Sequence, residues 1–274
     1  MSPPSIQIEP MAAALGAEIH GVDLTQPLDD ETFAEVERVW LEHQVIVFRD
    51  QPLGPEAHKA FASRFGPLHV HPVIPSRKDE GHPEIVVLES DERRPFLADA
   101  WHSDVTFEDR PPLGSVLHAV AVPETGGDTL WASMYAAYEA LSDRMQRLLS
   151  ELRAVHDGGA FRAVASPEQR EELEKNERAV HPVVRTHPVT GRKGIFVNSA
   201  FTRRIEGMKP AESQALLGFL YQHLASPDWT VRLRWRDHTV AFWDNRCTQH
   251  RVVADNRKAH RRMERVTIIG DVPV

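Results

Sequence analysis

The stretch of the chain that decides its fold and its chemistry is Trp101–Phe107, which reads WHSDVTF. It holds His102 and Asp104, and on a β-strand residues i and i+2 point to the same face. A further histidine, His250, ends the distant run WDNRCTQH. Two imidazoles and one carboxylate on one face of a metal ion leave the opposite face open, as in non-haem Fe(II) oxygenases. The pattern therefore predicts an iron site of His102, Asp104 and His250.

The His-x-Asp pair has a plainer interpretation as well. The chain contains 15 histidines, so such a pair also arises by chance. A salt-linked His–Asp pair on an exposed strand would have the same spacing. The iron hypothesis therefore depends on what the rest of the chain adds to these two residues.

The composition of the chain indicates an ordered protein with a sizeable core. Its 274 residues are 41% hydrophobic and 26% charged, so we expect one large β-barrel or sandwich domain spanning residues 1–274. The formal net charge is -8, which argues against nucleic acid or an anionic membrane surface as a partner. A small organic anion remains open as a substrate, because a few arginines can dominate a pocket.

Two features bear on the compartment. Cys247 is the single cysteine, so no intrachain disulfide can form, which suits a reducing cytoplasm. The first residues, Met1–Pro4, lack the basic and apolar regions of a signal peptide, and no run of 18 apolar residues occurs. We therefore expect a cytoplasmic protein without a membrane span.

The hydrophobic pattern alternates many short strands with a few helices. Strands are expected at 44–48, 84–88, 115–122, 129–132, 231–235, 239–243 and 265–269, and helices after Asp29 and at 55–65, 134–152 and 210–224. The polar stretch 167–180 is typical of a surface helix or a mobile lid. A mainly β jelly-roll barrel with covering helices fits this order better than a doubly wound parallel sheet. No Gly-x-Gly-x-x-Gly follows a strand, so a dinucleotide site is not supported.

Ordered motifs along nearly the whole chain add to the His–Asp pair. They are GAEI from Gly16, GVDL from Gly21, LHVHPV from Leu68, WHSDVTF, GGDTLWASMYAAYEALS from Gly126, HPVVRTHPVTGRKGIFVN from His181, FWDNRCTQHRV from Phe242 and RVTIIGDVPV from Arg265. Through these motifs the chain resembles the taurine dioxygenase family of Fe(II)/2-oxoglutarate-dependent oxygenases. The resemblance implies a double-stranded β-helix, the barrel form of the jelly roll.

The resemblance also implies a cofactor arrangement. Fe(II) would be held by the catalytic residues His102, Asp104 and His250, with 2-oxoglutarate and O2 as co-substrates. The far carboxylate of 2-oxoglutarate would meet Thr129 and Arg261, since a guanidinium pairs with a carboxylate in a bidentate manner. Arg261 also fits a solvated basic cluster with its two neighbours. Related halogenases lack the carboxylate ligand, so Asp104 favours hydroxylation.

For the substrate, the resemblance implies an anion held by His71 and Arg265. It also implies pocket walls from Val105, Phe107 and Phe201, each of which equally fits an ordinary core position. A plain loop histidine and a strand-end surface charge are the alternatives for the two anion residues.

Three positions depart from the taurine-specific pattern. Ile74 replaces a tyrosine, Ala98 replaces an asparagine, and Gly158 stands where an aromatic residue is expected. All three changes remove bulk or polar groups. We therefore expect a pocket for a longer or more apolar anion, such as an alkyl sulfate, a larger alkanesulfonate or an aryloxyalkanoate.

The predicted reaction is hydroxylation of the carbon next to a sulfonate or sulfate ester, a step of sulfur metabolism. It would give an aldehyde with sulfite or sulfate, besides succinate and CO2. Hydroxylation of an aryloxyalkanoate or amino acid at the same iron site stays open, as does a metal- or anion-binding barrel without turnover. We further expect a homo-oligomer, a dimer or tetramer, and a candidate lid within 158–180.

Overall fold

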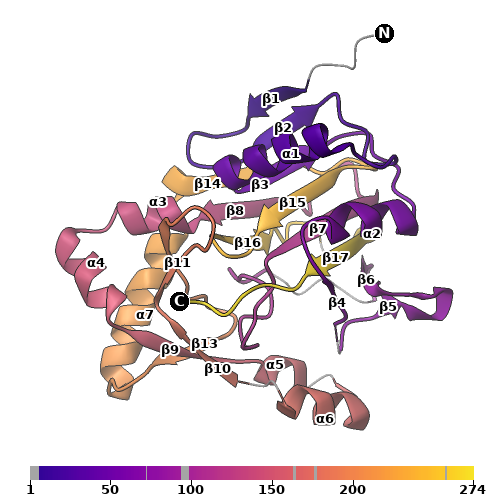
Figure 1. The fold of residues 1–274 in the computed structure, drawn as a ribbon. Coiled ribbons are helices and arrows are strands. Elements are labelled where there is room, and N and C mark those ends of the chain that lie inside the picture. Colours follow the sequence, from indigo (N-terminus) through magenta and orange to yellow (C-terminus); the bar gives the residue numbers. More distant parts are fainter. Residues whose placement is uncertain (1–5, 72, 94–98, 163–164, 176–177, 257) are drawn as a thin grey trace.

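Two β-sheets of different size face each other (Figure 1) and enclose an apolar core. The computed structural model describes residues 6–71, 73–93, 99–162, 165–175, 178–256 and 258–274. The larger sheet has the order β1-β2-β3-β15-β7-β17-β6-β5, with β4 also on β17. Its strands are β1 (Gln7–Pro10), β2 (Ala17–His20), β3 (Val45–Phe48), β4 (Leu68–His69), β5 (Ser76–Arg77), β6 (His82–Ser90), β7 (Gly114–Ala121), β15 (Val240–Asp244) and β17 (Arg261–Ile268).

The smaller sheet of the barrel has three antiparallel strands in the order β14-β8-β16. They are β14 (Thr230–Leu233), β8 (Thr129–Ser133) and β16 (Thr248–Val252). In the larger sheet the pairings are antiparallel as well, except for β2 with β3. The mainly β jelly-roll fold predicted from the sequence is therefore confirmed.

The period-two alternation of the strands separates two cores. On β15, Ala241 and Trp243 point between the sheets, whereas Val240 and Phe242 point to the outer face. Because both faces are covered, every residue of β15 is buried. This burial explains why the strand reads as a continuous apolar run and not as an alternating one.

Two helices cover the outer face of the larger sheet. They are α1 (Asp30–His43) and α2 (Pro55–Ser63). α1 begins as the sequence predicts, because the Asp29 carboxylate accepts a hydrogen bond from the Thr32 amide at 2.7 Å. Trp40 of α1 stacks on Phe242 at 4.4 Å between ring centroids, which fastens the helix to the sheet.

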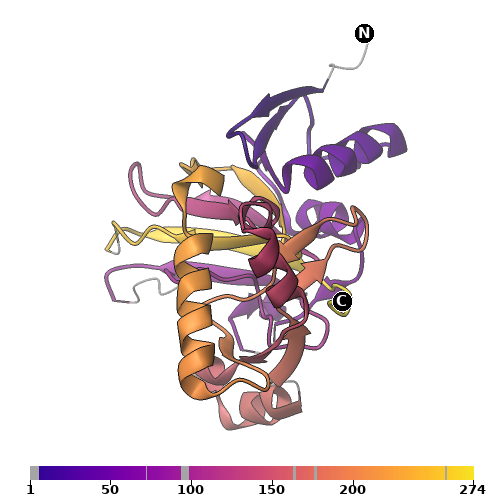
Figure 2. The same cartoon turned by 90° about the vertical axis from the view of Figure 1, so that its left-hand side faces the viewer.

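The long helix α7 (Pro210–Leu224) lies beside the barrel, in orange in Figure 2. A third apolar cluster forms around it. Its other elements are α3 (Met134–Glu139), α4 (Asp143–Ser150), β9 (Arg153–Asp157), β10 (Arg178–Pro182), β11 (Val184–Thr186), β12 (Lys193–Ile195) and β13 (Thr202–Ile205). The expectation of one helix over 134–152 is wrong. Ser142 caps a new helix by accepting from the Met145 amide, and Gln146 donates to the carbonyl of Leu141 at the break.

Short helices complete the chain. They are α5 (Gly159–Arg162), α6 (Pro167–Lys175), η1 (Lys78–Glu80) and η2 (Pro227–Trp229). α5 and α6 lie next to β9 and β10, at the end of the molecule far from α1 (Figure 1). The polar stretch 167–180 thus begins as the expected helix but ends in strand β10. No helix among the described residues is long and apolar enough to cross a membrane.

Candidate metal centre and substrate pocket

A single backbone bridge brings the two histidines of the predicted iron site together. The His102 amide donates to the His250 carbonyl at 3.0 Å, and the His250 amide donates to the His102 carbonyl at 2.8 Å. The two rings therefore lie side by side, 4.2 Å apart between centroids. Strand β16 thus places His250 next to His102, which is distant in the sequence.

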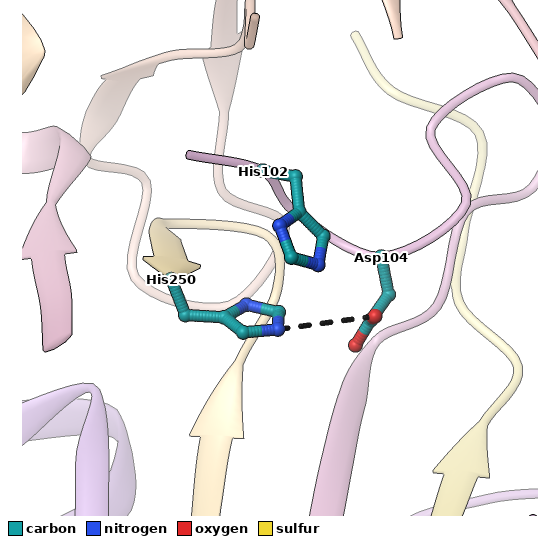
Figure 3. A group of neighbouring side chains, drawn as sticks. All are labelled: His102, Asp104 and His250. Carbon is teal, nitrogen blue, oxygen red and sulfur yellow. Dashed lines mark ion pairs between the residues drawn. The ribbon is translucent and has the colours of Figure 1, made fainter. Parts of the chain in front are cut away.

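Asp104 reaches the same place by a turn and not by a strand. The chain turns over residues 104–107, and Val105 has a φ of 40°, an uncommon conformation for a β-branched residue. The strand geometry expected for the His102–Asp104 pair is therefore wrong. The residues still converge: one ligand atom each from His102, Asp104 and His250 lies within 4.8 Å of the others (Figure 3).

Hydrogen bonding and burial prepare both imidazoles as neutral ligands. His102 Nδ1 lies 2.8 Å from the Ala100 carbonyl, which accepts only from a protonated nitrogen, so the lone pair is on Nε2. Burial, and then the neighbouring His102, hold the pKa of His250 well below its ordinary value. His250 Nε2 lies 4.0 Å from Asp104 Oδ1. Two neutral imidazoles beside one carboxylate are a donor set that fits Fe(II).

The Asp104 carboxylate is fixed by groups that the sequence reasoning missed. Its Oδ2 accepts from Ser115 Oγ at 2.8 Å and from Asn245 Nδ2 at 3.3 Å. Trp243 Nε1 in turn donates to Asn245 Oδ1 at 2.9 Å. The position of Asn245 inside the FWDNR motif, five residues before His250, was the feature of the sequence that could have indicated its role. Such partners orient a ligand and sustain its affinity for the metal.

Arg265 lies against the group formed by His102, Asp104 and His250. Its Nη1 donates to Asp104 Oδ1 at 2.6 Å. Burial alone would raise the pKa of the Asp104 carboxyl, but the charge of Arg265 and the hydrogen bond from Ser115 favour the ionised form and hold that pKa well below its usual range. The carboxylate is therefore ionised. Arg265 Nε is buried without an acceptor among the described residues, so the guanidinium keeps a donor for another anion.

His71, the other predicted anion residue, is a buried and neutral donor. Its Nδ1 accepts from the amides of Val73 at 3.1 Å and Ile74 at 3.0 Å, so the proton is on Nε2. That nitrogen is buried and has no acceptor within the described part of the chain. Burial, followed by Arg265, lowers the pKa of His71 to about 3. Ile74 thus contributes its backbone here, and Ala98 lies outside the described residues.

Thr129 and Arg261 lie on facing sheets, on β8 and on β17. Thr129 is buried on β8 and pairs across the sheet with Val252. Val252 and Arg261 line the same cavity. Thr129 Oγ1 accepts from Trp235 Nε1 at 2.9 Å, which leaves its hydroxyl proton for another acceptor. Burial lowers the pKa of Arg261 to about 10, and its guanidinium is still charged at neutral pH.

The predicted wall residues Val105, Phe107 and Phe201 form one buried apolar cluster. The expectation of open room at Gly158 is wrong. A Cβ atom there would lie 2.9 Å from two ring carbons of Phe107. The ring of Phe107 therefore occupies the space that a side chain at this position would need.

A second group of ligand-type residues consists of His187, Asp244 and Cys247, which we call the His187 group; His102, Asp104 and His250 are the His102 group. Asp244 accepts from Arg246 Nη2 at 2.6 Å and lies 3.0 Å from His187 Nε2. His187 Nδ1 accepts two backbone amides, so its Nε2 carries a proton. Burial raises the pKa of the Cys247 thiol well above its ordinary value. The lone pairs of Asp244 and of His187 Nδ1 therefore already accept hydrogen bonds from other groups of the protein.

Comparisons with known proteins agree with this geometry. The family model described as taurine catabolism dioxygenase TauD, TfdA family matches residues 7–267. An alkylsulfatase of Acinetobacter baylyi is 36% identical over 277 residues, 97% of this chain and 86% of the relative. An alpha-ketoglutarate-dependent sulfate ester dioxygenase of Pseudomonas putida is 36% identical over 98% of this chain and 91% of its own. The crystal structure of a taurine dioxygenase from Burkholderia xenovorans superposes with a TM-score of 0.86 at 38% identity, covering 99% of this chain and 91% of that one.

Fold and comparisons together define the class of protein. The chain is a 2-oxoglutarate-dependent dioxygenase, an oxidoreductase that uses Fe(II). Within that class it belongs to the taurine catabolism dioxygenase family.

Proposed function

We propose that His102, Asp104 and His250 hold Fe(II), while Thr129 and Arg261 receive the far carboxylate of 2-oxoglutarate. The substrate is a small organic anion with a sulfate ester or sulfonate, and the enzyme hydroxylates the carbon next to that group. The observation that carries this proposal is the pair of buried donors, His71 Nε2 and Arg265 Nε, which have no acceptor among the described residues. Buried donors without acceptors are costly, and an anionic substrate supplies the acceptors.

The division of labour follows from these positions. Bound Fe(II) and 2-oxoglutarate supply the oxidation, in which O2 gives one oxygen atom to succinate, formed with loss of CO2, and one to the substrate carbon. His71 and Arg265 hold the anionic head and so fix which carbon faces the metal. Burial of both residues keeps water away from the reacting carbon.

The hydroxylated product is unstable for a simple reason. Its new hydroxyl group loses a proton, a C=O bond forms, and the bond from that carbon to the sulfate oxygen breaks. Sulfate leaves with the electron pair, and an aldehyde remains. With a sulfonate, the C–S bond breaks in the same way and sulfite leaves.

A substrate panel with purified, iron-loaded protein tests this function. We expect succinate formation to depend on an alkyl sulfate or alkanesulfonate and to equal the release of sulfate or sulfite. Succinate formed with an aryloxyalkanoate or an amino acid, but with no sulfur compound, would replace the proposal by the carboxylate alternative. Taurine turnover with matching sulfite release would refute the expectation of a larger substrate.

Further proposals concern the protein as a whole. Residues 1–274 form one domain, and residues 158–180 include a lid, which is supported by a hydrogen bond at 3.4 Å from Gln169 of α6 to the Val73 carbonyl next to the pocket. We also propose a homo-oligomer, a dimer or tetramer, in the cytoplasm, where the single buried thiol of Cys247 stays reduced. Light scattering of the purified protein tests the oligomeric state.

A further inference from the structure

Three phenylalanine rings form a continuous wall beside the metal centre. Phe107 lies 5.3 Å from Phe201 and 5.7 Å from Phe161 between ring centroids, and Phe161 stacks on Phe201 at 6.1 Å and 18°. Phe107 and Phe201 come from the segments predicted as pocket walls. Phe161 comes from α5, and the sequence reasoning placed it only within a candidate lid.

The aromatic residue expected at position 158 is supplied three residues later. A Cβ atom at Gly158 would collide with the ring of Phe107, so a ring cannot stand there while Phe107 keeps its place. The Gly158 carbonyl accepts from the Phe161 amide at 2.9 Å, and the Asp157 carboxylate accepts from the Gly159 amide at 2.7 Å. These bonds fix the start of α5 and direct the Phe161 ring onto the other two.

The wall connects the candidate metal centre to His71. At one end the Phe201 ring lies 6.2 Å from the ring of His102. At the other end the Phe161 ring lies 5.3 Å from the ring of His71. Phe107 and Phe201 are fully buried, whereas Phe161 is partly exposed. A chain that leaves the reacting carbon therefore passes aromatic rings before it meets water.

We infer that Phe161 determines substrate specificity by contacting an apolar chain, and that alkyl sulfates or alkanesulfonates long enough to reach this ring bind more tightly than ethyl sulfate or taurine. This inference rests on the proposed function, since it takes His71 and Arg265 as the anion site. Each methylene group that is buried against the rings adds favourable binding free energy. The ammonium group of taurine would lose hydration there, and the Asp104 carboxylate at the site is already engaged by Arg265.

Binding measurements on the protein loaded with Fe(II) and 2-oxoglutarate, without O2, test the inference. Hexyl sulfate, ethyl sulfate and taurine are titrated calorimetrically. We expect hexyl sulfate to bind the unmodified protein at least about tenfold more tightly than ethyl sulfate. Phe161→Ala should lower the affinity for hexyl sulfate by about tenfold or more, and the affinity for ethyl sulfate by less than about threefold. Phe161→Leu should recover part of the loss, because it restores apolar contact.

Matched variants separate specificity from folding. Phe219→Ala removes an exposed ring on α7 and should leave all three affinities unchanged. Gly158→Ala should lower the affinity for hexyl sulfate, because the added Cβ atom displaces the Phe107 ring. The affinity for 2-oxoglutarate should stay the same in Phe161→Ala, and a loss there would indicate general damage.

Each result has a definite reading. Equal weakening of ethyl and hexyl sulfate by Phe161→Ala, or no weakening of either, overturns the inference. An unmodified protein whose affinity does not rise with chain length also overturns it. Failure of the proposed function looks different: the aerobic enzyme then releases no sulfate from any ester, even where binding depends on chain length and on Phe161.

Discussion

The His102 group and the His187 group have similar ligand chemistry but opposite hydrogen-bonding states. Each combines imidazole with carboxylate, and in each the candidate ligand atoms lie within 4.8 Å of one another. In the His187 group, Arg246 and a protonated His187 nitrogen already satisfy Asp244. In the His102 group, the bond from His102 Nδ1 to a carbonyl turns the other nitrogen toward the centre.

This difference shows that residue type and proximity do not make a metal site. A ligand must also present a lone pair that no other group in the protein uses. Asp244 therefore serves a buried ion-pair network that joins β15 to the chain around His187, whereas Asp104 keeps Oδ1 toward His250. Within the described part of the chain, Arg265 donates to that oxygen as well.

The largest contrast between the groups should come from removing their carboxylates, beginning with Asp104→Ala. Mutation of a residue that only supports a ligand typically lowers activity by about 10- to 100-fold. Loss of the ligand itself should lower the rate of hydroxylation by more than that. Substrate-dependent succinate formation and the iron retained after gel filtration measure the effect. Normal activity in this variant would disprove the His102 group as the iron site.

Asp244→Ala should instead lower stability. It leaves the buried Arg246 without its carboxylate, which typically costs about 3–5 kcal/mol of unfolding free energy. Urea denaturation measures the loss, and iron per folded molecule should not change. The exposed Asp79→Ala is the control. If Asp244→Ala lost iron and kept its stability, the roles of the two groups would have to be exchanged.

Arg261→Ala extends the comparison to the co-substrate. Removing a charged partner of a carboxylate costs about 1.5–3 kcal/mol, so the concentration of 2-oxoglutarate needed should rise by about 10- to 100-fold. The iron requirement should change far less. Arg262→Ala serves as the control, because this neighbour donates to Glu264 at 3.1 Å. Equal changes in both requirements would indicate destabilisation only.

Ser115→Ala tests whether the support of Asp104 matters. The serine donates to Asp104 Oδ2, and loss of such a partner should weaken iron binding by about tenfold. Competition with a chelator measures the affinity. The buried Ser213, which accepts from the Ile205 amide, offers the control Ser213→Ala, with lower stability and unchanged iron affinity. Unaltered affinity in Ser115→Ala would mean that Asn245 and Arg265 suffice to orient the carboxylate.

The smallest effect is expected at Cys247. Burial raises the pKa of its thiol, so the native protein should not react with iodoacetamide at neutral pH, whereas the unfolded protein should. Cys247→Ala should cost about 1 kcal/mol of unfolding free energy and leave the iron content unchanged. Iron loss in this variant would restore the His187 group as a candidate metal site.

The jelly-roll fold and the convergence of His102, Asp104 and His250 were both predictable, but the local geometry was not. The period-two pattern and the ordered motifs led to the barrel and to His102, Asp104 and His250. The assumed strand at Asp104 was wrong, because Val105 adopts a positive φ that its residue type disfavours. The helix break at Ser142 was missed, since an apolar helical pattern continues through it.

The sequence by itself determined the donor types, their local spacing and the apolar segments that build the two cores. Those properties depend on residue chemistry and on short-range periodicity, which can be read along the chain. Only the tertiary structure decided that Arg265 contacts Asp104, that Asp244 is already satisfied, and that Phe161 completes the wall beside Gly158. These contacts depend on strand register and close packing between distant segments, where a shift of one residue reverses every side chain.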